Sequence, residues 1–127
     1  MPFGWGESHD AYNQVYEQDS ENKGSFGHEL IAGGAAFAGF KAFEDHQRKE
    51  GKPTNHAFAK ELLAGFAGAE VDKLAETKGE DAWDREKARH EAKKNAERMY
   101  DQHYGEQEQY DPNYGPPERI NQQFGGY

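Results

Sequence analysis

The residues best suited to chemistry in this sequence are six histidines, several of which adjoin an acidic residue. They are His9, His28, His46, His56, His90 and His103. No two lie four positions apart, the spacing that places two imidazoles on one helix face, and no H-E-x-x-H motif occurs. A metal or haem site would therefore need histidines from separate helices, with partners that orient their rings. The candidates for such a site are His28, His46, His56 and His90, and the alternative is that these side chains lie on the surface or cap helix ends.

No other pattern in the sequence indicates catalysis. The serines lie outside any nucleophile-elbow motif. Gly33, Gly34 and Gly39 belong to a helix-like stretch, whereas a phosphate-binding loop would lie between a strand and a helix. The chain has no cysteine, which excludes disulfides and thiol chemistry. We therefore expect a protein that is not an enzyme, with no catalytic residues and no cofactor.

Two similar stretches organise the chain. Residues 28–44 read HELIAGGAAFAGFKAFE and residues 60–76 read KELLAGFAGAEVDKLAE, so that Gly33 of the first corresponds to Gly65 of the second. Apolar residues three and four positions apart predict a helix in each. A turn that contains Gly51-Lys52-Pro53 separates them, because glycine ends a helix and proline cannot continue it. A connection this short makes the two helices antiparallel neighbours.

Small residues are expected to form the contact between these two helices. A glycine inside a helix costs about 1 kcal/mol relative to alanine, so several glycines in one helix indicate close backbone approach. The helix-contact residues are predicted to be Gly33, Gly34, Ala38, Gly39, Gly65 and Gly68. If part of this small-residue face stays uncovered, it marks a site for a second copy or another protein. A homodimer is therefore one prediction, and a closed monomer with both faces buried is the alternative.

Together these patterns predict an all-α fold. A small bundle of three main helices is expected, in which a charged third helix covers the antiparallel Gly/Ala-rich hairpin. The third stretch carries many acidic and basic residues with a thin apolar set, so only one narrow side of it should be buried. The main helices are expected near residues 26–50, 55–77 and 80–104, with a short helix near 8–18.

Composition divides the chain into three parts. Residues 1–24 form an N-terminal arm that contains the short helix, and residues 25–104 form the helical domain. Residues 105–127 are rich in Tyr, Gln, Pro and Gly, and we expect them to be disordered because they lack an apolar period.

Charge and hydropathy exclude two classes of partner. The net charge is −9. The arm carries five acids and one base and the tail four acids and one base, which leaves −2 for residues 25–104. No basic face is present, so we expect no nucleic-acid binding. No apolar run reaches the roughly 18 residues of a membrane span, and the first ten residues lack the pattern of a secretory signal, so we expect a cytoplasmic protein.

Four segments carry a resemblance to a known family. They read GWGESHDAYNQVY, HELIAGGAAFAGFKAFEDHQ, GKPTNHAFAKELLAGFAGAEVDKLAET and WDREKARHEAKKNAERMYDQHY. Over about residues 4–104 the chain resembles the fungal CipC-like antibiotic-response proteins, a family that corresponds to a domain of unknown function. The resemblance implies a small intracellular fungal protein that responds to stress or drugs. It implies no reaction, cofactor or catalytic residue.

Three functional hypotheses follow. The first, which we favour, is a non-enzymatic stress- or antibiotic-response protein that acts through protein–protein contacts. The second is a helical protein that binds a small molecule, a metal or haem through its histidines. The third is a stress-related peripheral membrane protein that uses the Ala/Gly-rich helix.

Overall fold

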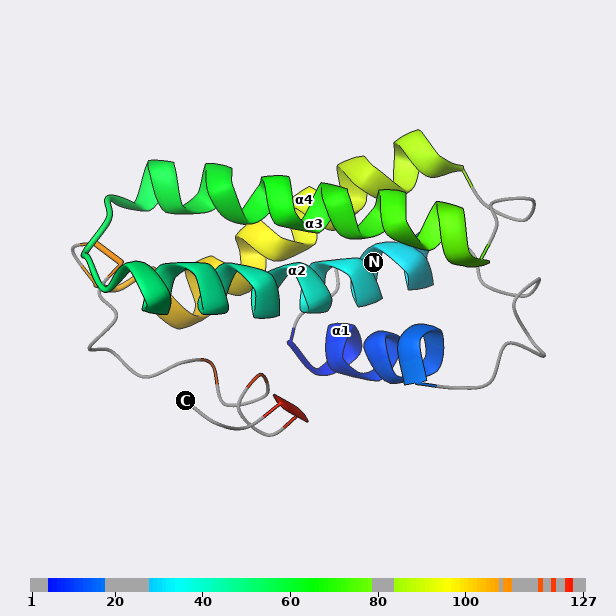
Figure 1. The fold of residues 1–127 in the computed structure, drawn as a ribbon, viewed down its shortest axis with the longest axis horizontal. Coiled ribbons are helices and arrows are strands. Elements are labelled where there is room, and N and C mark those ends of the chain that lie inside the picture. The colour runs from blue at the N-terminus through cyan, green and yellow to red at the C-terminus, as the bar shows by residue number, and fades with distance from the viewer. Residues whose placement is uncertain are drawn as a thin grey trace.

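A computed structural model describes residues 5–17, 28–78, 84–107, 109–110, 117, 120 and 123–124 of the chain. These residues form four α-helices and one π-helical turn (Figure 1). The elements are α1 (Trp5–Tyr12), η1 (Asn13–Glu17), α2 (His28–Glu50), α3 (His56–Lys78) and α4 (Arg85–Tyr104). The predicted all-α bundle of three main helices with a short N-terminal helix is confirmed. None of the described helices has the length and apolar character needed to cross a membrane.

Local capping sets the helix ends. Asn55 caps α3 by accepting a hydrogen bond from the backbone N–H of Phe58 at 2.8 Å, and Asp84 caps α4 in the same way. Gly51 has a φ of +71°, a conformation that glycine adopts without strain, and it follows the last residue of α2. The third main helix begins later than expected, at Arg85, because Asp84 is extended and serves as its N-cap.

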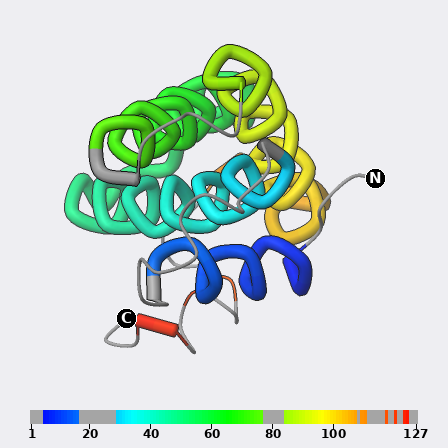
Figure 2. The backbone as a smooth tube through the Cα atoms, turned by 90° about the vertical axis from the view of Figure 1, so that its right-hand side faces the viewer, coloured from blue at the N-terminus to red at the C-terminus, as the bar shows by residue number. Residues whose placement is uncertain are grey.

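α2 is the central helix of the fold. α1 packs on one side of it, and α3 and α4 pack on the other (Figure 2). The side chains of Phe37, Phe40 and Phe43 on α2 are fully buried. Trp5 of α1 lies with its ring centroid 4.7 Å from that of Phe40, and its indole N–H donates to the carbonyl of Met99 in α4 at 3.1 Å. The N-terminal helix is therefore part of the packed interior.

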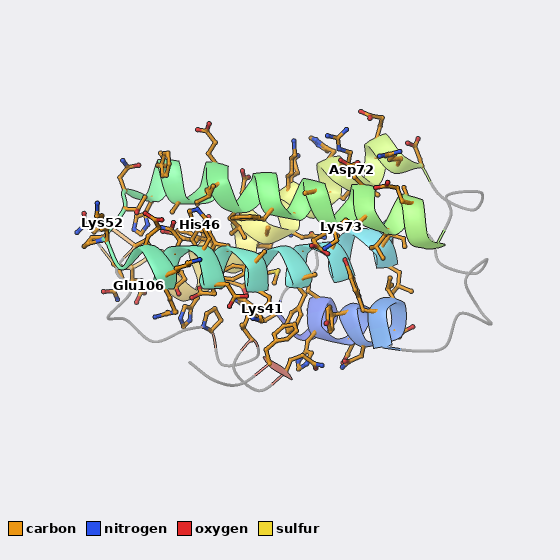
Figure 3. All side chains as sticks on the ribbon, in the orientation of Figure 1. Lys41, His46, Lys52, Asp72, Lys73 and Glu106 are labelled. Carbon is orange, nitrogen blue, oxygen red and sulfur yellow. The ribbon has the colours of Figure 1, made fainter. Side chains whose placement is uncertain are left out.

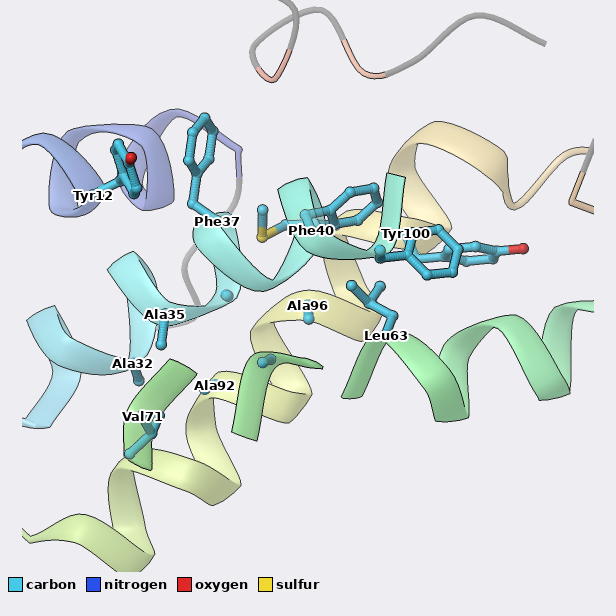
Figure 4. Close-up of a cluster of buried hydrophobic side chains, with 14 of the residues drawn as sticks. Tyr12, Ala32, Ala35, Phe37, Phe40, Leu63, Val71, Ala92, Ala96 and Tyr100 are labelled. Carbon is cyan, nitrogen blue, oxygen red and sulfur yellow. The ribbon is translucent and has the colours of Figure 1, made fainter. Parts of the chain in front are cut away.

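Between α2, α3 and α4 the core combines many alanines with larger side chains such as Phe40 and Tyr100 (Figure 4). Alanines from α2 and α4 meet Leu63 and Val71 of α3, and all of these residues are fully buried. The charged helix α4 buries only a narrow set of residues. This agrees with the thin apolar pattern of its sequence.

Glycines provide some of the close contacts expected of them. A Cβ atom on Gly39 would lie 2.7 Å from the backbone of Ala67, so α2 and α3 touch there. A Cβ atom on Gly34 would meet the backbone of Ala11 at 3.3 Å, which places this glycine against α1 and not against α3. A Cβ atom on Gly68 would meet a lysine side chain of α4 at 3.2 Å. The small residues therefore serve three different helix pairs.

The expected contact at Gly65 is corrected. Gly65 is exposed, and a Cβ atom there would have no neighbour within 4 Å. The repeat aligns it with Gly33, which is buried, but the two helices do not turn equivalent positions towards each other. Ala38 is partly buried and packs against the core.

Replacing Gly39 and Gly65 with alanine should change the stability of the protein in opposite directions. Gly39→Ala should lower the free energy of unfolding by about 1–3 kcal/mol, because its methyl group would overlap backbone atoms that cannot rotate away. The matched control, Gly65→Ala, should raise the stability by up to about 1 kcal/mol, because alanine favours the helix and meets nothing. Urea unfolding of both variants measures the difference. Equal effects at the two positions would contradict the packing described for α2 and α3.

The described residues after α4 return to the bundle. Tyr110 and Ile120 are fully buried, and Phe124 packs with its ring centroid 5.4 Å from that of Tyr12. The backbones of Thr54 and Tyr110 pair in an antiparallel bridge, with N–O distances of 2.9 and 2.7 Å. The expectation that residues 105–127 are disordered is therefore corrected for these positions. Their apolar side chains pack one by one, without the helical or strand period that sequence patterns reveal.

Candidate functional site

A buried polar cluster lies at the end of the bundle that carries the α2–α3 turn. The side chain of Glu44 on α2 is fully buried. Its Oε2 accepts a hydrogen bond of 2.5 Å from the hydroxyl of Tyr104, and its Oε1 lies 2.7 Å from Nε of Arg48. Arg48 also donates through Nη2 to the Tyr104 hydroxyl at 3.2 Å. Both carboxylate oxygens therefore have a partner inside the protein.

Burial controls the ionisation of this cluster. Burial raises the pKa of the Glu44 carboxyl above its ordinary value, although the Tyr104 hydrogen bond and the charge of Arg48 act in the opposite direction. Burial and the nearby Glu44 charge also raise the pKa of Tyr104 and of Tyr110. The phenols therefore stay protonated and able to donate hydrogen bonds. Because the Glu44 side chain is fully buried, it cannot touch a substrate, and we interpret the cluster as structural.

His56 belongs to the same end of the bundle. Its Nδ1 lies 2.7 Å from the hydroxyl of Tyr100, and its Nε2 lies 2.5 Å from the carbonyl oxygen of Gln107. Because a carbonyl only accepts, Nε2 is the nitrogen that donates. Both ring nitrogens are therefore engaged, and neither is free to bind a metal.

His46 and His90 are the other candidates whose side chains the structure describes, and they lie on different helices. His46 is exposed on α2, beside the ring of Phe66 at a centroid distance of 5.8 Å, and His90 is exposed on α4. The side chain of His28 lies outside the described part. Within the described ranges, no group of three histidine, aspartate or glutamate side chains could hold a metal ion. His9, which was not among the candidates, stacks on Phe37 at 4.7 Å.

A second feature is an open apolar strip on the side of α3 that faces away from the core. It encloses a shallow groove of about 430 Å³. We call it the outer face of α3, and its residues are Phe58, Glu61, Leu62, Gly65, Phe66 and Ala69. Phe58 is 55% exposed, and among the described residues it is the one large apolar side chain with an exposed surface. The remaining described apolar side chains of this size are buried or partly buried.

Sequence reasoning missed this face because α3 has apolar residues on two sides. Leu62 and Leu63 are neighbours in the chain, yet Leu63 is fully buried and Leu62 only partly. A signal was present in the spacing of Phe58, Leu62, Gly65 and Ala69, which follow one another at four, three and four positions. That spacing describes a second apolar stripe beside the one that faces the core.

Comparison with known proteins gives one family. A family model described as "Virulence factor CipC-like", for a domain of unknown function, matches residues 11–103. The match covers α2, α3 and nearly all of α4, and it begins within α1. No curated protein and no solved structure matches the chain.

Proposed function

The chain belongs to the CipC-like family, whose function is unknown, and we propose that it binds another protein through the outer face of α3. The resemblance of its segments to antibiotic-response proteins supports a role in a stress or antibiotic response. The protein would carry out that role without catalysing a reaction.

The observation that carries this proposal is the exposed Phe58. A single exposed apolar side chain is common on protein surfaces. Phe58, however, shares one side of α3 with Leu62, Gly65 and Ala69, and these four residues form an apolar strip along three turns, with Glu61 beside it. The other described large apolar side chains are buried or partly buried, so the exposure of Phe58 is an exception in this fold. Aromatic residues within such strips are frequent anchors of protein interfaces.

The shape of the outer face of α3 favours a protein over a small molecule. Every residue that lines the groove comes from one helix, so a ligand would contact the protein on one side only. Small-molecule sites bury most of the ligand's surface, which requires walls from several elements. A long, shallow, apolar strip matches instead the apolar face of another helix.

A photo-crosslinking experiment tests the proposal. The photoreactive amino acid benzoylphenylalanine replaces Phe58 in the full chain, which is then illuminated in the cells that produce it. The control places the same amino acid at Lys94, an exposed position on α4. We expect a covalent protein adduct of discrete mass from position 58 and none from position 94. Both substitutions are on the surface, so they should change the stability by no more than about 0.5 kcal/mol.

The outcome decides whether the outer face of α3 binds a protein. A discrete adduct that disappears when Leu62 is also replaced by serine would support an apolar contact along the strip. The absence of any adduct from position 58, or the same adducts from positions 58 and 94, would contradict the proposal.

A further inference from the structure

The outer face of α3 has the spacing of a helix–helix seam. Phe58, Leu62, Gly65 and Ala69 alternate at four and three positions, which is the heptad spacing that keeps one stripe facing a partner helix. Leu63 and Ala67, which are fully buried, occupy the opposite side of the helix. The groove along the stripe is lined by α3 residues alone, and Phe58 is exposed. In Figures 1 and 2, α3 lies at the outside of the bundle. A partner that fits this stripe is expected only if the outer face of α3 binds a protein, as proposed above.

The order of side-chain sizes along the stripe is self-complementary. From the N-terminal end the residues are large, large, small and small. In an antiparallel pair with a two-fold axis between residues 63 and 64, Phe58 of one copy lies opposite Ala69 of the other. Leu62 then lies opposite Gly65, where a side chain would meet open space in the single chain. Each large residue is thus matched with a small one, as interdigitated packing requires.

A parallel pair lacks this match. It would set Phe58 against Phe58 and Gly65 against Gly65, so that one end of the stripe would be crowded and the other would contain a gap. The large-to-small order therefore favours one orientation of a second copy.

The charges beyond the stripe agree with the antiparallel orientation. Lys52 lies in the turn that precedes α3, as Figure 3 shows, and Glu76 lies near the C-terminal end of the helix; both are exposed. The same two-fold axis brings the turn that carries Lys52 of one copy to the end of α3 that carries Glu76 of the other, once on each side of the axis. Exposed ion pairs add little affinity, but they select an orientation.

We propose that the outer face of α3 binds a second copy of this chain, as an antiparallel homodimer in which Leu62 occupies the space over Gly65. The stripe covers about three helical turns, which is much less than the roughly 800 Å² per partner of a stable complex. The dimer is therefore weak, with a dissociation constant of about 10⁻⁴ M. It forms where the protein is abundant.

Sedimentation equilibrium of the purified full chain tests the proposal over about 10 to 500 µM, a range that brackets the expected dissociation constant. Gly65→Leu should raise that constant at least about tenfold, because two leucines would then compete for one space. Leu62→Ala should raise it by a similar factor, because it leaves the space empty. The double variant Leu62→Ala/Gly65→Leu exchanges the two sizes and should return the constant to within about threefold of the original.

Each alternative outcome overturns a defined part of the inference. A Gly65→Leu variant that associates more tightly than the original chain would show parallel pairing and reject the antiparallel register. A chain that stays monomeric across the whole range would reject the homodimer. If benzoylphenylalanine at position 58 still gave a discrete adduct of a mass other than twice the chain, the proposed function would stand with a different partner. Circular dichroism of each variant separates loss of pairing from loss of fold.

The charges give an independent test of the orientation. Lys52→Glu should weaken the dimer, because it would place two acids together on each side of the axis. The double variant Lys52→Glu/Glu76→Lys restores opposite charges and should recover the original association. A double variant no better than the single one would contradict the register.

Discussion

Replacing Tyr110 with alanine should lower the free energy of unfolding by about 3–5 kcal/mol, although this residue lies outside every regular helix. Its side chain is fully buried. Its ring centroid lies 5.4 Å from that of Phe43 and 5.0 Å from that of Tyr104. Alanine would leave a cavity the size of a phenol beside the polar cluster. Urea unfolding followed by circular dichroism measures the loss.

Tyr110→Phe provides the matched control. It keeps the ring and removes a hydroxyl that is buried without a hydrogen-bond partner among the described residues. Because an unpaired buried hydroxyl is unfavourable, the stability should be unchanged or slightly higher. A loss below about 1 kcal/mol for Tyr110→Ala would show that the segment after α4 does not pack as described.

Replacing Arg48 with methionine should destabilise the protein by about 3–5 kcal/mol at pH 8, because it leaves Glu44 buried without its cation. Glu44 already has a raised pKa, for which burial is the largest cause, and Arg48 acts to lower that pKa. Without Arg48, the pKa should rise further. An acid whose pKa is higher in the folded state stabilises the fold below its unfolded pKa, and this contribution is lost as pH rises through the folded pKa. The loss of stability should therefore be smaller at pH 5 than at pH 8.

Urea unfolding at the two pH values separates charge from packing. A loss that is the same at pH 5 and pH 8 would assign the effect to the buried methylene groups of Arg48 instead of its charge. The control is the double variant Glu44→Gln/Arg48→Met, which removes both charges but leaves an amide oxygen that can accept the Tyr104 hydrogen bond. It should recover most of the stability at pH 8.

The main helices could be predicted because each carries its own period and its own end signals. α2 and α3 lie where the apolar spacing placed them, and Gly51 separates them as expected. α1 and α4 were also expected, but their starts differ, since the start of α4 depends on the conformation of Asp84. Helix boundaries depend on single capping residues, and in a polar sequence several neighbouring residues could each cap the helix.

The faces of the helices could not be predicted in the same way. α3 is apolar on two sides, so the period identifies a helix without saying which side turns inward. Gly39 and Gly65 have similar surroundings in the sequence, yet one touches a neighbouring backbone and the other meets nothing. The choice between them depends on where the neighbouring helices lie.

The buried polar cluster could not be predicted from the sequence, for a different reason. Glu44 stands in a run of charged residues with Lys41, Asp45 and Arg48 nearby, and nothing local marks it as the buried one. Tyr104 and Tyr110, which come much later in the chain, contribute to its surroundings. Contacts between distant residues leave no periodic trace in a single sequence.

The distance along the chain between Glu44 and the phenol that covers it also determines the order of assembly. Tyr104 follows Glu44 by 60 residues. When α2 first leaves the ribosome, neither Tyr104 nor Tyr110 has been synthesised, and the carboxylate of Glu44 remains in water. Closing so long a loop is entropically unfavourable until its contacts form. Synthesis of the chain through Tyr110, and not formation of the α2–α3 hairpin, is therefore what allows this end of the interior to close.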